Sequence, residues 1–150
     1  MTKAQQSDSS LVDPRNARAD GYRQEIEEAI AEKACPLCPP MKWHPNPILH
    51  RLEGWFITAN SHPYDNTEHH LLMIAERHIE QLSDLSTTDL GSILNLSNWA
   101  TKEFNIRGGG ITMRFGDTLY TGATIKHLHA HLIVPKVEDN QVSPVYFPIG

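Results

Sequence analysis

Residues 121–135 read TGATIKHLHAHLIVP, and the histidines of this stretch decide how the whole chain is interpreted. His127, His129 and His131 stand at alternate positions in an otherwise apolar run. Because side chains of a β-strand alternate between its two faces, the spacing predicts a strand over residues 124–134 with all three imidazoles on one face. The apolar side chains of the other face would pack on helices, which leaves the histidines lining a cleft. Three buried imidazoles without partners would be costly, so the pattern indicates a functional site.

Three kinds of surface fit this pattern. The first is the polar outer face of an antiparallel sheet, although three histidines in strict alternation are unusual there. The second is a metal site, including that of a metalloenzyme with an open coordination position, because histidines of one strand can converge on zinc with a ligand from elsewhere. The third is a phosphoryl- or nucleotidyl-transfer site, in which a neutral imidazole attacks phosphorus and its neighbours bind or protonate the oxygens. The residues alone do not rank the second above the third.

The two cysteines, Cys35 and Cys38, form a C-x-x-C pair. A redox dithiol of the thioredoxin type is disfavoured, because that motif opens a helix and the prolines of residues 36–47 prevent one. A metal knuckle is favoured, since a bound ion would hold this proline-rich loop in place. Further histidines offer alternative ligands: His44, His50, His62, His69 and His70.

The rest of the chain predicts an α+β fold, with an antiparallel β-sheet, one long helix and one short helix. Residues 1–20 are polar and aperiodic, and they are expected to form a mobile tail before a single domain of residues 21–150. Strands are predicted over residues 54–60, 69–76, 111–117 and 124–134. These strands have mostly short, hairpin-compatible connections, which favours antiparallel pairing.

The two helices have recognisable apolar faces and ends. The short helix is predicted over residues 20–33, where Tyr22, Ile26 and Ile30 share a face. The long helix is predicted over residues 85–104, with Ser86 or a neighbouring threonine as its N-cap and Asp89 in its first turn. Its buried stripe is expected to comprise Leu90, Ile93, Leu94, Ser97, Thr101 and Phe104.

Composition and charge exclude some partners. The 150 residues carry a formal net charge of −5, so duplex nucleic acid is not an expected partner. A compact anionic ligand stays compatible with this charge, because a local pocket can differ in sign from the whole molecule. The sequence shows neither a membrane-spanning run nor the apolar core of a signal peptide, so a cytoplasmic protein with no membrane partner is expected.

Three segments together resemble a known superfamily. HLHAHLI, residues 127–133, resembles the H-φ-H-φ-H-φ-φ signature of the histidine triad (HIT) superfamily of nucleotide hydrolases and transferases. Residues 60–79, NSHPYDNTEHHLLMIAERHI, are similar to the superfamily's N-x-x-P-Y … H-L-L-φ-φ-P-x-R-H-φ segment, one helix upstream of the triad. CPLC at residues 35–38 resembles the zinc knuckle of many members. The resemblance covers about residues 35–135 and implies a HIT-like fold.

The resemblance implies catalytic and substrate-binding roles. His129 matches the nucleophile that attacks the α-phosphorus of a nucleotide and holds a covalent nucleotidyl group. His127 and His131 match the flanking catalytic histidines, which order the phosphate oxygens and the nucleophile. Asn60 matches a ribose-contacting position, and Thr124 matches a hydroxyl that meets a phosphate oxygen.

The resemblance also implies a structural zinc ion. In zinc-bearing relatives, which include galactose-phosphate uridylyltransferase, two cysteines are joined by the histidine of the R-H segment and by the first triad histidine. The corresponding ligands here are Cys35, Cys38, His78 and His127. Four protein ligands leave no open position for water, so the ion would be structural and would hold the strand that carries His129.

The chain departs from the superfamily pattern in places that concern the substrate. Gly122 and Ala123 stand where phosphoramidate-cleaving members carry Gly-Gln, and Ala123-Thr124 looks more like the zinc-bearing dinucleoside-polyphosphate phosphorylase or hydrolase branch. Where many members place an asparagine against the phosphates, this chain has RFGDTL, which makes Arg114 a candidate phosphate contact. Ala75 replaces the proline of the R-H segment.

The implied function is that of a HIT-type nucleotide hydrolase or nucleotidyltransferase. It would act at the α-phosphorus through a covalent nucleotidyl-histidine intermediate, on dinucleoside polyphosphates or related nucleotides. The alternative is a zinc-containing nucleotide-binding or sensing module with little turnover. Homodimers are common among the relatives, and a homodimer is therefore one expected assembly.

Overall fold

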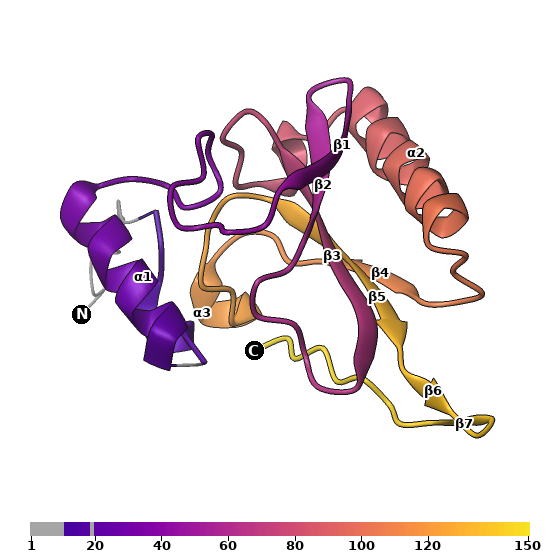
Figure 1. The fold of residues 1–150 in the computed structure, drawn as a ribbon. Coiled ribbons are helices and arrows are strands. Elements are labelled where there is room, and N and C mark those ends of the chain that lie inside the picture. The colour runs from indigo at the N-terminus through magenta and orange to yellow at the C-terminus, as the bar shows by residue number, and fades with distance from the viewer. Residues whose placement is uncertain (1–10, 19) are drawn as a thin grey trace.

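The computed structural model describes residues 11–18 and 20–150, and within them it contains a five-stranded antiparallel sheet. Its strands are β1 (Ile48–Leu52), β2 (Trp55–Ala59), β3 (Thr67–Ala75), β4 (Gly110–Met113) and β5 (His129–Pro135). The helices are α1 (Asp20–Glu32), α2 (Thr87–Glu103) and the single-turn α3 (Thr118–Thr121), with 3-10 turns at Pro14–Asn16 and Leu82–Asp84. A small hairpin of β6 (Val137–Glu138) and β7 (Gln141–Val142) follows β5. The predicted α+β class is confirmed, with α1 and α2 on opposite sides of the sheet (Figure 1).

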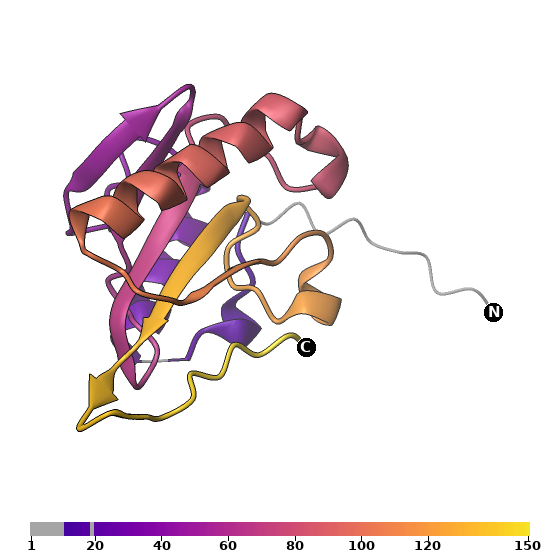
Figure 2. The same cartoon turned by 90° about the vertical axis from the view of Figure 1, so that its right-hand side faces the viewer.

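The strand order β1-β2-β3-β5-β4 places the last strand of the sheet inside it. β1, β2 and β3 follow one another as neighbours, and the β1–β2 hairpin turns through Glu53 and Gly54, whose φ angles are 47° and 79°. Two positive φ angles are typical of the turn that matches the twist of a hairpin. The chain then passes through α2 to the edge strand β4 and returns through α3 as β5, which lies between β3 and β4 (Figure 2). His129 and His131 therefore lie beside β3, opposite Ile74 and Leu72.

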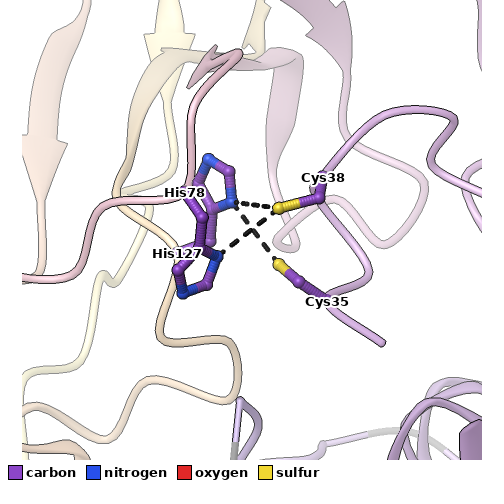
Figure 3. A group of neighbouring side chains, drawn as sticks. All are labelled: Cys35, Cys38, His78 and His127. Atoms are coloured by element: carbon purple, nitrogen blue, oxygen red, sulfur yellow. Dashed lines mark hydrogen bonds between the residues drawn. The ribbon is translucent and has the colours of Figure 1, made fainter. Parts of the chain in front are cut away.

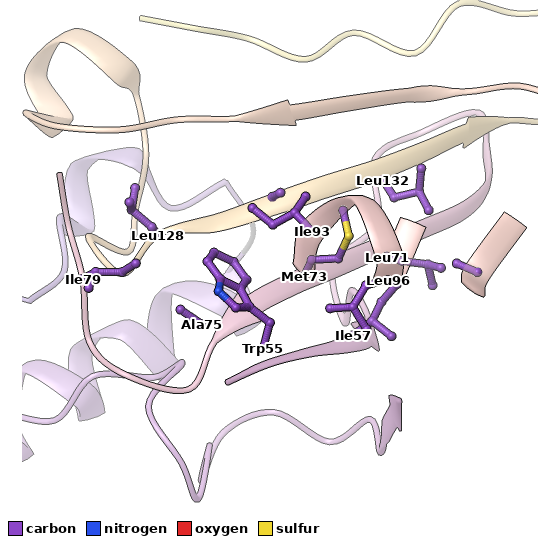
Figure 4. Close-up of a cluster of buried hydrophobic side chains, with 12 residues drawn as sticks. Trp55, Ile57, Leu71, Met73, Ala75, Ile79, Ile93, Leu96, Leu128 and Leu132 are labelled. Atoms are coloured by element: carbon purple, nitrogen blue, oxygen red, sulfur yellow. The ribbon is translucent and has the colours of Figure 1, made fainter. Parts of the chain in front are cut away.

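One face of the sheet packs against α2 (Figure 4). The buried α2 positions are Asp89, Ser92, Ile93, Leu96, Ser97 and Ala100, so the predicted stripe is wrong by about one residue. Leu90 and Leu94 are 53% and 58% exposed. Small hydroxyl residues take the inner positions because they return their hydrogen bonds to the helix, for example Ser97 Oγ to the Ile93 carbonyl at 2.7 Å.

The opposite face packs against α1 and the start of the described chain. Ile26 of α1 is fully buried there, whereas Ile30, predicted on the same face, is 40% exposed. Val12 is buried and pairs with Ile125, and the Asp13 amide donates to the Thr124 carbonyl at 2.6 Å. Residues 11–18 thus belong to the fold, which corrects the predicted tail boundary at residue 20. Residues 1–10, which the same prediction includes, lie outside the described residues.

β5 begins at His129 and not at residue 124 as predicted. The preceding segment bonds to other parts of the chain: the Lys126 amide donates to the Leu11 carbonyl at 3.1 Å, and the Leu128 amide to the Ile79 carbonyl at 2.7 Å. His127 is consequently outside the strand, and its side chain need not share the face of the other two histidines. None of the helices in the described ranges is both long and apolar enough to cross a bilayer.

Asp89 joins the start of α2 to the sheet and to the R-H segment. Its carboxylate accepts hydrogen bonds from Trp55 Nε1 at 2.8 Å, from two Arg77 nitrogens at 2.7 Å each, and from the Ser86 amide at 2.7 Å. The reciprocal bond from the Asp89 amide to Ser86 Oγ, at 3.2 Å, completes a capping box. The Arg77 guanidinium, followed by the Trp55 and Ser86 hydrogen bonds, holds the pKa of this buried carboxyl far below its usual range.

Replacing Asp89 by asparagine is expected to lower the free energy of unfolding by about 2–4 kcal/mol at pH 7, because a buried charged acceptor is lost beside Arg77. A carboxyl with a depressed folded-state pKa stabilises the fold above its unfolded pKa of about 4, and this stabilisation is lost as the pH falls through the lower folded value. The deficit of the variant should therefore shrink on acidification. Urea unfolding at several pH values measures both effects, with Asp139→Asn in the exposed β6–β7 hairpin as control. An unchanged deficit at low pH would contradict the assignment.

Candidate functional site

A cavity of about 930 Å³ opens on the sheet face opposite α2. Its volume lies in the range of about 300–1,000 Å³ that is typical of small-molecule sites. The walls come from α1, the proline-rich loop, the loop before β3, and the segments on both sides of the β5 start. All the predicted catalytic and substrate-binding residues line it: His127, His129, His131, Asn60 and Thr124.

The four predicted zinc ligands form one cluster beside this cavity (Figure 3). Cys35 Sγ and Cys38 Sγ each lie 3.4 Å from His127 Nδ1, and Cys38 Sγ lies 3.5 Å from His78 Nδ1. All four ligand atoms are within 4.8 Å of one another. Ligand atoms around a tetrahedral zinc ion lie roughly 3.3–3.8 Å apart for normal Zn–S and Zn–N bond lengths. These three distances fall in this range, so the four residues could hold a tetrahedral metal ion.

The two histidines of the cluster present the correct nitrogen to a metal. His127 Nε2 lies 2.8 Å from the Ala75 carbonyl, and His78 Nε2 lies 2.9 Å from Glu80 Oε1. Because a carbonyl and a carboxylate only accept, each Nε2 carries the proton and each Nδ1 faces the thiols with its lone pair. A carbonyl or carboxylate behind the ligating imidazole is the usual outer partner of a zinc histidine.

Burial sets the protonation of the cluster in the metal-free chain. It lowers the pKa of His127 to about 4, with the Ala75 carbonyl opposing the shift, so the ring is neutral at pH 7. It raises the pKa of the Cys35 thiol to about 12, with the Cys38 thiol adding to the effect. A bound cation supplies the positive charge that stabilises the thiolates, so metal binding would release protons.

His129 is oriented by the backbone of the residue that begins the triad. Its Nδ1 lies 2.7 Å from the His127 carbonyl. The carbonyl can only accept, so Nδ1 carries the proton and Nε2 has a free lone pair at the cavity wall. Burial, opposed by this hydrogen bond and helped by the nearby Arg114 charge, lowers the pKa of His129 below its ordinary value. A neutral imidazole with a free Nε2 is the nucleophilic form.

A fourth histidine, His70, determines the tautomer of His131. The Tyr64 amide donates to His70 Nδ1 at 3.0 Å, so the neutral His70 ring carries its proton on Nε2. That Nε2 lies 2.8 Å from His131 Nδ1 and donates to it. His131 must then carry its own proton on Nε2, as a hydrogen-bond donor. His129 and His131, whose ring centroids are 4.9 Å apart, thus offer a lone pair and a donor side by side.

Both rings of the His70–His131 pair stay neutral at pH 7. Burial lowers the pKa of His70 to about 4, and it lowers the pKa of His131 well below its ordinary value. The positive charges of Arg114 and Arg18 act in the same direction on both rings. The tautomers derived above therefore hold in the physiological pH range.

Asn60 and Thr124 line the cavity, yet both already have protein partners. Asn60 Oδ1 accepts from the His62 amide at 2.9 Å; its Nδ2 lies 3.2 Å from His70 Nε2, which in the tautomer derived above is a contact between two donors and not a hydrogen bond. The Thr124 side chain hydrogen-bonds to Tyr22, and its carbonyl accepts from the Asp13 amide. Their substrate contacts stay predictions.

The alternative metal ligands are not part of the cluster. In residues 11–18 and 20–150, the group of Cys35, Cys38, His78 and His127 is the one found to be able to hold a metal ion. The remaining candidates bond to a hydroxyl, pack on aromatic rings or, in one case, bond to His131: His44, His50, His62, His69 and His70.

Two important residues of the site, His70 and Tyr64, were not predicted in their roles: His70 was expected only as an alternative metal ligand, and Tyr64 had no predicted role. Adjacent histidines at residues 69 and 70 point to opposite faces of β3, and periodicity alone does not say which one is inside. One sequence feature could have shown that His70 is the inner residue: it alternates with Leu72 and Ile74, whose side chains are on the buried face opposite α2.

The sequence matches one known protein family. Residues 35–143 match the family described as DcpS_C, "Scavenger mRNA decapping enzyme C-term binding". Among curated proteins none matches the sequence significantly.

Several solved structures share the fold. A histidine triad nucleotide-binding protein from Candida albicans is 22% identical with a TM-score of 0.58, over 78% of this chain and 85% of that chain. A HIT family hydrolase from Clostridium thermocellum is 22% identical with a TM-score of 0.52, over 70% and 92%. A zinc-bound histidine triad family protein from Mycobacterium smegmatis is 20% identical with a TM-score of 0.51, over 70% and 76%.

Proposed function

This chain belongs to the histidine triad superfamily, in the family of the scavenger mRNA decapping enzyme C-terminal binding domain, and from that premise we propose that it cleaves or transfers nucleotides at the α-phosphorus. The superfamily is one of nucleotide hydrolases, so an enzyme is supported at the family level. The observation that carries the finer proposal is the pair of opposite tautomers at His129 and His131, which lie side by side on the wall of one cavity.

The proposed reaction has two steps. The lone pair of His129 Nε2 forms a bond to the α-phosphorus, and the bond from that phosphorus to the bridging oxygen breaks, so that the remaining phosphate or nucleotide leaves with the electron pair. An oxygen of water or of another acceptor then attacks the same phosphorus, the N–P bond breaks, and Nε2 recovers its lone pair. His131 Nε2–H donates to a phosphate oxygen as charge develops there. His127 supplies the carbonyl that keeps the His129 proton on Nδ1.

We propose that Cys35, Cys38, His78 and His127 bind zinc as a structural ion. The fit of the cluster to tetrahedral spacing supports this role, as does the zinc-bound relative from Mycobacterium smegmatis. Bound zinc supplies rigid cross-linking of the proline-rich loop, the R-H segment and the start of β5. Because His127 also offers its carbonyl to His129, the site would stabilise the orientation of the nucleophile.

The proposed substrates are dinucleoside polyphosphates or related nucleotides. The cavity volume suits a nucleotide. The alternative is a zinc-containing nucleotide-binding or sensing module with little turnover.

A labelling experiment tests the reaction. The zinc-loaded protein is incubated briefly with diadenosine tetraphosphate, adenosine 5′-phosphoramidate or ADP, and the reaction is then quenched rapidly without acid. We expect peptide mass spectrometry to find an adenylyl group on the peptide that carries His129, and chromatography to show AMP or a transferred adenylyl product. Tight nucleotide binding without an adduct or product would favour the sensing module. Absence of both binding and turnover with this panel would contradict the proposed function.

A further inference from the structure

Two arginines reach the cavity from outside the triad. Arg18 follows the first 3-10 turn of the described chain, and Arg114 follows β4. Both line the cavity together with His129 and His131. Arg18 also lies outside residues 35–143, the part of the chain that matches the family, so its place here is a feature of this chain.

Tyr64 brings the two guanidinium groups together. The Arg18 guanidinium carbon lies 4.7 Å from the centroid of the Tyr64 ring, and Arg114 Nη2 lies 3.3 Å from the Tyr64 hydroxyl. The same ring contacts His70, with centroids 4.6 Å apart, and stacks near His131 at 6.1 Å. Two positive charges therefore flank the aromatic ring that packs on the histidine pair.

The present partners of these guanidinium groups are neutral. Arg114 donates to the Pro148 carbonyl of the segment that follows β7 and returns past α3, and it lies over the Phe147 ring at 3.8 Å (Figures 1 and 2). Among the side chains that the structure describes, which exclude that of Asp20, no carboxylate lies within 4.0 Å of Arg18 or Arg114, whereas Arg15, Arg51 and Arg77 each pair with one. A bound anion can replace the carbonyl or the aromatic ring as the partner of a guanidinium group, because neither of these displaced partners carries a charge that would then be left unpaired.

We propose that Arg18 and Arg114 form a second anion subsite, which holds the phosphates beyond the α-phosphate of a polyphosphate substrate. The inference rests on the proposed function and narrows the substrate class to nucleotides with an extended phosphate chain. A planar guanidinium binds phosphate oxygens through two parallel hydrogen bonds, a geometry that suits polyphosphates better than a single esterified phosphate. The subsite would bind the departing phosphates while His129 and His131 act on the α-phosphate.

The electrostatics of the histidines agree with this placement. After burial, which is the largest effect, the charges of Arg114 and Arg18 both disfavour protonation of His131. Cations close enough to oppose a proton on His131 are also close enough to attract an anion bound beside it. In a chain of net charge −5 such a local positive region marks the place where an anionic ligand would enter.

The test compares substrates that differ in phosphate number. Arg18→Met and Arg114→Met variants, each loaded with zinc, are assayed with diadenosine tetraphosphate and with adenosine 5′-phosphoramidate, which has a single phosphate. We expect kcat/KM for the tetraphosphate to fall about 10- to 100-fold in each variant, the loss typical of one charge-assisted hydrogen bond, with a smaller fall for the phosphoramidate. Arg107→Met, at an exposed arginine outside the cavity, should change neither.

A binding measurement keeps the subsite testable apart from turnover. Calorimetry with inorganic tripolyphosphate and inorganic phosphate should show tighter tripolyphosphate binding to the unmodified chain, and a loss of this preference in both variants. If the unmodified chain has no activity but shows this pattern, the proposed function fails and the subsite stands. Equal losses for both nucleotides, or tripolyphosphate binding that both variants retain, would overturn the subsite. Unchanged melting temperatures and zinc contents confirm that the variants are folded.

Discussion

Replacing His129 by asparagine is expected to lower nucleotide turnover by at least about 10³-fold, because the chain loses the atom that forms the bond to phosphorus. Asparagine is similar in size, and its side-chain amide can still donate to the His127 carbonyl, so the local backbone should be retained. Steady-state kinetics with diadenosine tetraphosphate measures the loss. Mass spectrometry should find no adenylylated peptide after incubation.

Zinc content and nucleotide binding separate this role from the alternatives. His129 is not part of the Cys35–Cys38–His78–His127 cluster, so the asparagine variant should retain its zinc. His69→Asn, at a half-buried histidine that packs on Phe104, is the matched control and should keep most of the activity. Loss of zinc from the His129 variant would favour a metalloenzyme, and unchanged turnover would show that another group is the nucleophile.

Replacing Cys38 by serine is expected to release zinc and to lower the melting temperature by roughly 10 °C or more, since metal-binding free energy at such a site contributes directly to folding. Cys38 Sγ contacts both His78 Nδ1 and His127 Nδ1, so the remaining ligands lose their common neighbour. Metal analysis of the purified chain and thermal unfolding, each with and without added zinc, measure the effect. Turnover should also fall, because the carbonyl that orients His129 belongs to His127, a proposed zinc ligand.

His50→Asn is the control for the zinc prediction. His50 is close to the knuckle in sequence, yet its ring stacks on Trp99 with centroids 4.7 Å apart and is not in the cluster. The control should keep its zinc and should lose little stability. Equal metal content and equal melting of Cys38→Ser and the unmodified chain would rule out the structural zinc.

Secondary structure was predictable where local signals agreed with tertiary contacts. The long helix begins where Ser86 and Asp89 predicted, because the capping box is a local interaction. Ile93 and Ser97 are buried as predicted, whereas Leu90 and Leu94 are exposed and Ser92 takes an inner position, because its hydroxyl is satisfied by the Thr88 carbonyl inside the helix. β1 and the β6–β7 hairpin have short or weakly apolar sequences and were not predicted.

The prediction that His127, His129 and His131 share one face of a single strand failed at His127, because β5 begins at His129. Residues before His129 bond to the segment after residue 10 and to Ile79, contacts between positions far apart in the chain. The backbone leaves the sheet there, so the His127 ring turns to the cysteines while His129 and His131 stay at the cavity. A period of two describes a continuous strand, and it carries no information about where the strand stops.

The amino-acid sequence by itself determined the α+β class, the family resemblance and the identities of the residues that meet in the Cys35–Cys38–His78–His127 cluster and along the triad. Residue type and spacing carry the class, the C-x-x-C pair and the alternating histidines, whereas the full ligand set was implied by the family resemblance. Only the tertiary structure decided the tautomers of His129 and His131, the role of His70, and the convergence of Arg18 and Arg114 on Tyr64. Each of these depends on hydrogen bonds or charges between segments separated by many residues, and such contacts exist only once the sheet has brought those segments together.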